Sequence, residues 1–303
     1  FNPNQYAKTK DFSIFMNPLV ESVIEMGSIM KPLTLAASID SGSITASTTY
    51  TDKGFLVFGP SRIENYDGKG RGVVDMQRVL NDSLNTGAVF AMQRMGKDKF
   101  RDYMLGYGFG EKTGIELPQE GKNNISNIIG NSREIEYATA SFGQGIAVTP
   151  IAMVAALSSL ANGGLLMKPH IVKEESVKGL RNHVVSSEEI RRVLKKETAE
   201  EMTRMLVSVV DNALVGGVDK MEHYSVAAKT GTAQLVEKGK RTYAEGEFNH
   251  TFFGYAPAYD AKFLTFLFIV KPQGAKYASN TLTEPFMDIT KFLLNYYEIP
   301  PDR

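Results

Sequence analysis

The chain has 303 residues, of which 43% are hydrophobic and 22% charged, so it can bury a sizeable core and is not disordered. Its 34 Lys and Arg residues balance 34 Asp and Glu residues, which argues against a nucleic-acid binder or a polybasic membrane-surface protein that works through bulk charge. The absence of Cys excludes disulfides, zinc–thiolate sites, iron–sulfur clusters and a Cys nucleophile.

No segment has the pattern of a signal peptide or a membrane span. The most apolar long stretch, residues 146–161, contains Thr149, Pro150 and two serines, and it falls short of the roughly 18–20 apolar residues that a span needs. We therefore expect a buried helix there. The first residue is Phe1 rather than Met, so we expect a cut or processed chain, and a membrane anchor upstream of it stays open.

The first half of the chain is predicted to be mainly helical. Residues 28–39 form a strongly apolar segment between Gly27 and Gly42, which favours a buried helix. Residues 43–70 are rich in Ser, Thr, Gly and Tyr, which is typical of a loop with short strands. Apolar residues at helical spacing predict further helices at 73–80, 88–95, 99–105 and 145–161.

After about residue 165 the pattern favours strands. The predicted elements are a strand at 168–174, two amphipathic helices within 187–214, strands at 224–236, 251–255 and 263–271, and a closing helix at 284–297. The turn-rich link Ala256–Asp260 joins the last two strands as a hairpin. The fold class is therefore mixed α/β, with an antiparallel sheet flanked by helices and a helical part at roughly 43–165 of one domain, 1–303.

Lys31 lies among apolar neighbours, including Met30 and Leu33, in the expected helix. Burial of an ammonium is costly unless it is paired or gives up its proton, and a neutral Lys is a usable general base. Ser28 lies three residues earlier on the same helix face, at the expected helix N-terminus, where free N–H groups favour a developing oxyanion. The two residues form a nucleophile and base pair. The alternative is a lysine that reaches solvent beside an incidental serine.

Two further motifs offer groups that can bind a substrate. Ser83 and Asn85 lie in a polar break between two helices, where both can point into a cleft; the alternative is a helix cap. On the expected strand 224–236, alternation puts Thr230 and Thr232 on one side, so both hydroxyls could bind a carboxylate. Gly231 between them lets a substrate backbone approach, and the alternative is an edge strand with a glycine bulge. The four His residues form no metal pattern, and His250 is expected to have an ordinary packing role.

In this order, Ser-x-x-Lys, Ser-x-Asn and Lys-Thr-Gly resemble the signature of penicillin-binding proteins and serine β-lactamases. Longer stretches are similar to the transpeptidase domain of a class B penicillin-binding protein, over nearly the whole chain. These stretches are Gly27–Thr34, Gly108–Gly110, Thr113–Pro118, Ser141–Gly145, Ala161–Gly164, Ala228–Gln234 and Phe253–Pro257.

The resemblance implies roles for the catalytic side chains. Ser28 resembles the acylated nucleophile and Lys31 the base that takes its proton. Ser83 is similar to the proton shuttle to the leaving amine. Lys229 resembles the cation that orders Ser83 and steers the substrate carboxylate.

The resemblance also implies how the substrate is held. Asn85 resembles the group that binds the substrate amide, and Thr230 and Thr232, on either side of Gly231, resemble the hydroxyl ligands of the carboxylate. The backbone N–H groups of Ser28 and Thr232 would form the oxyanion hole.

A peptidoglycan D,D-transpeptidase is therefore expected, which needs no cofactor or metal. Its implied partners are peptidoglycan stem peptides that end in D-Ala-D-Ala, β-lactam antibiotics and a glycan-polymerising protein in the membrane, with no nucleic acid. The implied place is the extracytoplasmic face of the bacterial cytoplasmic membrane, with an anchor upstream of this chain. Family domains begin with two strands before the Phe-x-Pro-Asn stretch, which here is Phe1–Asn4, so the sheet is expected to lack strands. Met26 stands where Pro is common.

Two other functions share these motifs. The first is a hydrolase, either a D,D-carboxypeptidase or a serine β-lactamase; class A β-lactamases deacylate with a Glu and a positioned water, and Glu116 and Glu120 are acids without an assigned role. The second is a non-catalytic β-lactam-sensing domain that is acylated once and signals.

Overall fold

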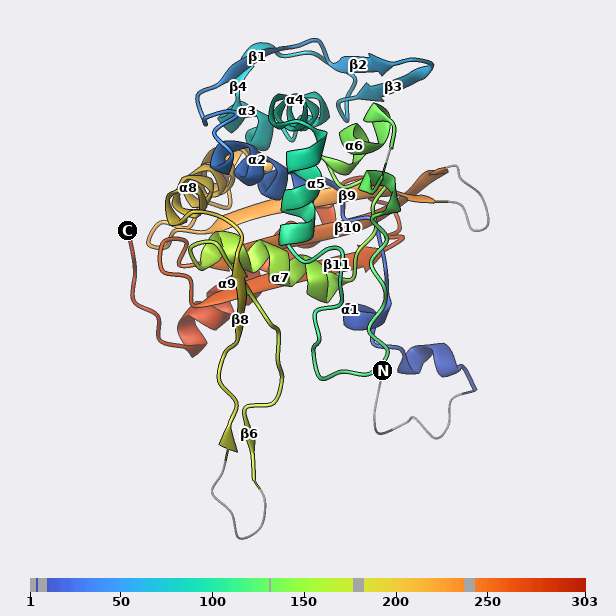
Figure 1. The fold of residues 1–303 in the computed structure, drawn as a ribbon. Coiled ribbons are helices and arrows are strands. Elements are labelled where there is room, and N and C mark those ends of the chain that lie inside the picture. The colour runs from blue at the N-terminus through green and yellow to red at the C-terminus, as the bar shows by residue number, and fades with distance from the viewer. Residues whose placement is uncertain (1–3, 5–9, 131, 177–182, 237–242) are drawn as a thin grey trace.

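The computed structural model describes residues 4, 10–130, 132–176, 183–236 and 243–303 (Figure 1). Most of the expected Phe-x-Pro-Asn start lies outside these residues. The α-helices are α1 (Pro18–Glu21), α2 (Lys31–Asp40), α3 (Met76–Asn81), α4 (Asn85–Met95), α5 (Lys97–Gly106), α6 (Glu134–Ala140), α7 (Pro150–Ala161), α8 (Lys196–Asn212) and α9 (Ser279–Tyr296). Short 3₁₀ helices are η2 (Phe12–Phe15), η3 (Gly27–Met30), η4 (Ser126–Ile128) and η5 (Leu214–Gly217).

The strands fall into one larger sheet and several two-stranded ribbons. Their bounds are β1 (Thr49–Asp52), β2 (Phe55–Phe58), β3 (Ser61–Glu64), β4 (Gly72–Asp75), β5 (Leu165–Met167), β6 (Glu174–Glu175), β7 (His183–Val184), β8 (Glu189–Arg192), β9 (Ala227–Val236), β10 (Tyr243–Ala256) and β11 (Phe263–Val270). None of the helices in the described ranges is both long and apolar enough to cross a membrane.

The larger sheet has the antiparallel order β11–β10–β9. Ala256 of β10 lies opposite Phe263 of β11, so the predicted hairpin is confirmed. On its other side β10 pairs with β9, with His250 opposite Thr232. Within the described residues, no further strand pairs with β9, the strand that carries Lys229.

The two faces of the sheet are covered by different helices (Figure 1). Phe252 of β10 stacks on Phe286 of α9, with ring centroids 4.3 Å apart. The hydroxyl of Tyr255, three positions along the strand, lies 2.8 Å from the hydroxyl of Thr203 in α8. Because successive side chains of a strand point to opposite faces, α9 and α8 lie on opposite sides of the sheet. The larger hydrophobic core is on the α8 side and also contains side chains of α2, α4, α5 and α7.

The mixed α/β class and the antiparallel sheet flanked by helices are confirmed, while several element bounds were wrong. The helix expected at 73–80 begins only at Met76, because Val73 and Val74 pair with β1 and the Asp75 side chain caps the helix. The helix expected at 145–161 begins at Pro150. Before it, Ala147 and Val148 bridge other backbone segments.

In the second half, the region 187–214 has one long helix, α8, rather than two. The first part of this region is strand β8, because residues 189–192 pair with β5. The strand expected at 168–174 was also wrong, since β5 ends at Met167 and β6 begins at Glu174. Helix α6 was missed; Glu136 accepts the backbone N–H of Arg133 at its start, but Arg133 is not one of the N-cap residues that a capping-box pattern requires.

Candidate active site

A glycine turn presents Ser28. Gly27 has a φ of 61° and donates its N–H to the carbonyl of Gly143 at 3.0 Å. A Cβ at Gly27 would lie 2.7 Å from the carbonyl oxygen of Thr232, so only glycine lets the turn approach β9 this closely. Ser28 lies half-buried in the 3₁₀ turn η3, and the α-helix itself begins at Lys31. Ser28 was expected at the N-terminus of the α-helix, and it lies instead in the short 3₁₀ turn just before that helix.

Lys31 joins the first two predicted motifs. Its side chain is 0% exposed, and Nζ lies 2.9 Å from Ser28 Oγ, 2.6 Å from the Ser83 carbonyl oxygen and 3.1 Å from Ser83 Oγ. A neutral amine has two N–H donors and one lone pair. Two donors directed to Ser83 leave the lone pair to accept the Ser28 hydroxyl proton. The three oxygens around Nζ suit either form of the lysine, because an ammonium could donate to all three and a neutral amine could donate to two and accept from Ser28.

Burial and charge favour the neutral form of Lys31. Burial lowers the pKa of Lys31 well below its ordinary value of 10.5, and the positive charge of Lys229 lowers it further. Burial also lowers the pKa of Lys229, to about 8, so Lys229 stays mostly protonated near pH 7. Burial and the charge of Lys229 therefore both favour the neutral form of Lys31, while Lys229 keeps most of its own charge near pH 7.

The Ser83 motif lies in a tight turn between α3 and α4. Ser83 has a φ of 53°, in the left-handed region, and its N–H donates to the Leu80 carbonyl. Asn85 is the first residue of α4, and its Nδ2 donates to the carbonyl of Glu64 at 2.7 Å. The turn brings Ser83 to Lys31, whereas a substrate role for Asn85 stays a prediction.

The Lys-Thr-Gly motif runs along β9 beside the serine turn. Lys229 is 4% exposed and its Nζ donates to the carbonyl of Thr230 at 3.1 Å. An ordering contact from Lys229 to Ser83 is not among the contacts that this part of the chain shows, so it stays a prediction. A Cβ at Gly231 would lie 2.7 Å from the Met26 carbonyl oxygen. Gly231 is therefore required for a close contact within the protein, between β9 and the backbone of Met26.

A carboxylate behind the serine turn was missed by the sequence analysis. Glu25 lies three residues before Ser28, accepts the N–H of Gly145 at 2.9 Å and accepts the hydroxyl of Tyr243 at 3.2 Å. Burial raises the pKa of Glu25 to about 7. In the sequence, its position three residues before the expected nucleophile was the feature that could have indicated a role in the site. Glu25 ties the Ser28 turn to the Ser141–Gly145 stretch, which had been noted only for its resemblance.

The other acids considered earlier are engaged elsewhere. Glu120 accepts the backbone N–H groups of Thr113 and Gly114, and Glu116 accepts the N–H of Ile171. Within the described ranges, no group of three or more His, Asp or Glu residues is arranged to hold a metal ion.

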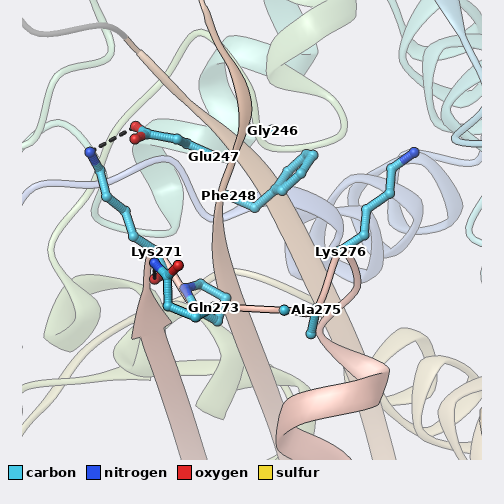
Figure 2. A pocket seen from close by; sticks show the side chains of 9 residues that line it. Gly246, Glu247, Phe248, Lys271, Gln273, Ala275 and Lys276 are labelled. Carbon is cyan, nitrogen blue, oxygen red and sulfur yellow. Dashed lines mark hydrogen bonds and ion pairs between the residues drawn. The ribbon is translucent and has the colours of Figure 1, made fainter.

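A hollow of about 560 Å³ lies beside β10 and the loop after β11 rather than around Ser28. Residues 246–248 of β10 and the loop 271–276 line it, and the ion pair between Lys271 and Glu247 (2.7 Å) closes one side (Figure 2). The loop continues into Ala278, whose N–H donates to Thr232 Oγ1 at 3.0 Å. The hollow therefore borders the segment that contacts Thr232.

The fold defines the class of protein. The chain is similar to penicillin-binding protein 3 of Mycobacterium tuberculosis in a crystal structure with aztreonam, with a TM-score of 0.84 and 25% identity over 95% of this chain and 66% of that one. The family model described as the penicillin binding protein transpeptidase domain matches residues 1–291. The chain therefore belongs to the penicillin-binding protein transpeptidase domain family, as the motifs predicted.

Curated relatives share this domain. Stage V sporulation protein D of Bacillus subtilis is 34% identical over 95% of this chain and 44% of its own length. Peptidoglycan D,D-transpeptidase MrdA of Acinetobacter baumannii is 27% identical over 85% of this chain and 43% of its own length. The chain thus spans less than half the length of these relatives.

Proposed function

We propose that this chain is the acyl-transfer domain of a peptidoglycan D,D-transpeptidase that works through a serine acyl-enzyme. The observation that carries the proposal is the placement of the buried Lys31 amine between the hydroxyls of Ser28 and Ser83. The relative MrdA of A. baumannii, a peptidoglycan D,D-transpeptidase, supports the choice of reaction. We place the domain at the extracytoplasmic face of the cytoplasmic membrane, with a glycan-polymerising protein as a further proposed partner.

Acylation follows from the geometry of the three side chains. Neutral Lys31 takes the proton of Ser28 Oγ as Oγ bonds to the penultimate D-Ala carbonyl carbon of the stem peptide. The backbone N–H groups of Ser28 and Thr232 stabilise the oxyanion. When the C–N bond to the terminal D-Ala breaks, its amine receives a proton through Ser83. The products are the Ser28 ester and free D-Ala.

The remaining motif residues bind the substrate. Cationic Lys229 and the hydroxyls of Thr230 and Thr232 bind the terminal carboxylate, while Asn85 binds a backbone amide of the stem peptide. In the second half-reaction an amine of a neighbouring stem peptide attacks the ester, gives up a proton to Lys31, and releases Ser28. β-Lactams acylate Ser28 because their strained amide presents the same carbonyl, and the bound aztreonam in the M. tuberculosis structure supports this reading.

Labelling by a fluorescent penicillin tests the proposal. The wild-type chain should form a covalent adduct that peptide mapping places on Ser28, and Ser28→Ala should form none while keeping its fold. Ser158→Ala is a matched control, because the Ser158 hydroxyl only donates to the Ala155 carbonyl within α7. An adduct of equal yield on Ser28→Ala would exclude Ser28 as the nucleophile.

The lifetime of the adduct separates the hydrolase alternatives. Since Glu116 and Glu120 hold backbone amides elsewhere, we expect the acyl-enzyme to persist for minutes or longer when chased with unlabelled drug. Rapid turnover of a chromogenic cephalosporin would favour a β-lactamase. Acylation without transfer to an added amine acceptor would favour the β-lactam-sensing function.

A further inference from the structure

The hydroxyl of Thr232 has its hydrogen-bond direction set by the start of α9. Thr232 Oγ1 accepts the N–H of Ala278 at 3.0 Å. Because a hydroxyl has one proton, occupation of a lone pair by this N–H leaves the Thr232 proton to be donated elsewhere. Ala278 is the residue just before the 18-residue helix α9, whose positive dipole end favours an anion at this place.

A buried histidine holds the segment around Ala278. His250 is 0% exposed and lies opposite Thr232 in the β9–β10 register. Its Nε2 lies 3.1 Å from the Lys276 carbonyl oxygen, and its Nδ1 lies 2.8 Å from Thr281 Oγ1. A carbonyl only accepts, so Nε2 carries the proton and donates. Burial lowers the pKa of His250, so the ring is neutral and Nδ1 accepts the Thr281 hydroxyl.

These two contacts flank Ala278 on both sides along the chain. On the N-terminal side the loop 271–276 borders the hollow of about 560 Å³, so it has little packing there (Figure 2). On the C-terminal side, Thr281 Oγ1 also lies 3.3 Å from the Ala278 carbonyl oxygen, so its single proton is shared between that oxygen and the nearer His250 Nδ1. The ring of His250 is therefore the buried anchor that fixes where the Ala278 N–H points.

We propose that His250 is a positioning residue for binding of the substrate carboxylate. It holds residues 276–281 so that the Ala278 N–H engages Thr232 Oγ1, and the Thr232 hydroxyl then donates its proton to the carboxylate. The inference rests on the proposed function, in which Thr232 binds that carboxylate. It replaces the expectation of an ordinary packing role for His250.

The test compares a β-lactam with and without its negative charge. Second-order acylation rates are measured for benzylpenicillin and for its methyl ester, which lacks the carboxylate. His250→Phe removes both hydrogen bonds and should slow acylation by the acid by about tenfold or more, the usual scale of one hydrogen bond to a charged group. Acylation by the ester should change by less than about twofold. His250→Gln can still donate and accept, and it should retain most of the acid rate.

Two controls make the result specific. His170→Phe changes an exposed histidine whose ring lies 3.1 Å from the Val172 carbonyl oxygen, away from Thr232 and Ala278, and it should leave both rates unchanged. Thr232→Val should show the same loss for the acid alone, and adding His250→Phe to it should cost nothing more, because both changes remove one interaction. Equal losses for acid and ester, or additive losses in the double variant, would overturn the proposal in favour of a purely structural role.

Amide hydrogen exchange at Ala278 gives a readout that needs no catalysis. Exchange should be faster in His250→Phe than in the wild type, and unchanged exchange would refute the anchoring. If the wild type is not acylated at all, the proposed function fails while this measurement still decides the anchoring. If His250→Phe does not fold, Thr281→Val removes one of the two anchors and should show the same preference for the acid, with a smaller loss; equal effects on both compounds would refute the proposal.

Discussion

Replacement of Lys31 by Met separates its chemical role from its structural one. Met keeps an apolar chain of similar length in a site that is 0% exposed, and it removes the amine that lies 2.9 Å from Ser28 Oγ. Loss of a general base costs about 10²–10⁴-fold in rate. We therefore expect the second-order rate of acylation by penicillin to fall within that range in Lys31→Met.

The same substitution should spare the stability of the fold. Loss of the donor at 2.6 Å leaves the Ser83 carbonyl without a partner, which costs about 1–3 kcal/mol. Against this, a lysine whose folded pKa lies below its unfolded value contributes stability only above the unfolded pKa of 10.5, and that stability is lost as pH falls through the folded pKa. At pH 7, below the unfolded value of 10.5, part of this stability is already lost, so removal of Lys31 offsets the missing hydrogen bond. The free energy of unfolding at pH 7 should hold or rise.

The pH dependence gives a second number. The pKa of Lys229 falls from 10.5 in the unfolded chain to about 8 in the folded one. Since one pKa unit is about 1.4 kcal/mol, this shift costs the folded state about 3 kcal/mol at pH below 8. In Lys31→Met, urea unfolding should therefore show, among its pH-dependent changes, a rise in stability between about 8 and 10.5 that comes from Lys229. The wild type should show a larger rise that begins at lower pH.

Lys31→Arg supplies the refuting result. Arginine stays protonated and cannot accept the Ser28 proton, so acylation should fail nearly as badly as in Lys31→Met. The assay is the acylation rate as a function of pH for the wild type and both variants, with circular dichroism as the check on folding. If Lys31→Arg reacts within a few-fold of the wild type, Lys31 is not the base and the reasoning from its burial is wrong.

Two further predictions concern the support of the serine turn. The pKa of Glu25 is raised from 4.5 to about 7, so Glu25 contributes stability that is present below pH 4.5 and lost as pH rises through about 7. Glu25→Gln should therefore gain stability relative to the wild type across this window. A stability difference in urea unfolding that does not change with pH would contradict this. Gly143 has a φ of 85°, and a Cβ there would collide with the backbone of Gly27, so Gly143→Ala should lower the melting temperature and slow acylation. The matched control is Gly274→Ala, at a φ of 73° with open space around it, which should cost only the left-handed strain of about 1–2 kcal/mol; equal losses would exclude the collision.

Local patterns predicted the parts of the site that lie within a few residues of one another. The apolar run at 28–39 predicted the buried helix, and the three-residue spacing placed Ser28 and Lys31 together, as the 2.9 Å contact shows. Alternation along the strand placed Thr230 and Thr232 on one side, and the register with β10 agrees. The turn-rich link at Ala256–Asp260 was enough for the hairpin, because hairpin turns are decided by their own residues.

Contacts between distant segments could not be predicted in this way. Nothing near Gly143 indicates that its carbonyl receives the Gly27 N–H, and nothing near His250 indicates that the start of α9 covers it. Helical and strand periods say which face of an element is buried but not which segment covers it. For the same reason Val73 was assigned to a helix: it is 71% exposed, and its pairing with β1 decides its conformation.

The two buried lysines differ in the charge that surrounds them. Lys31 faces two hydroxyls and one carbonyl, which an ammonium or a neutral amine can both satisfy, so it is burial and the nearby charge of Lys229 that favour its neutral form. Lys229 contacts the carbonyl of Thr230, which accepts equally well from an ammonium, and its pKa of about 8 keeps most of its charge at neutral pH. That charge in turn lowers the pKa of Lys31. The cation that would bind a carboxylate therefore also helps to keep the base unprotonated, which links substrate binding and proton transfer in one electrostatic arrangement.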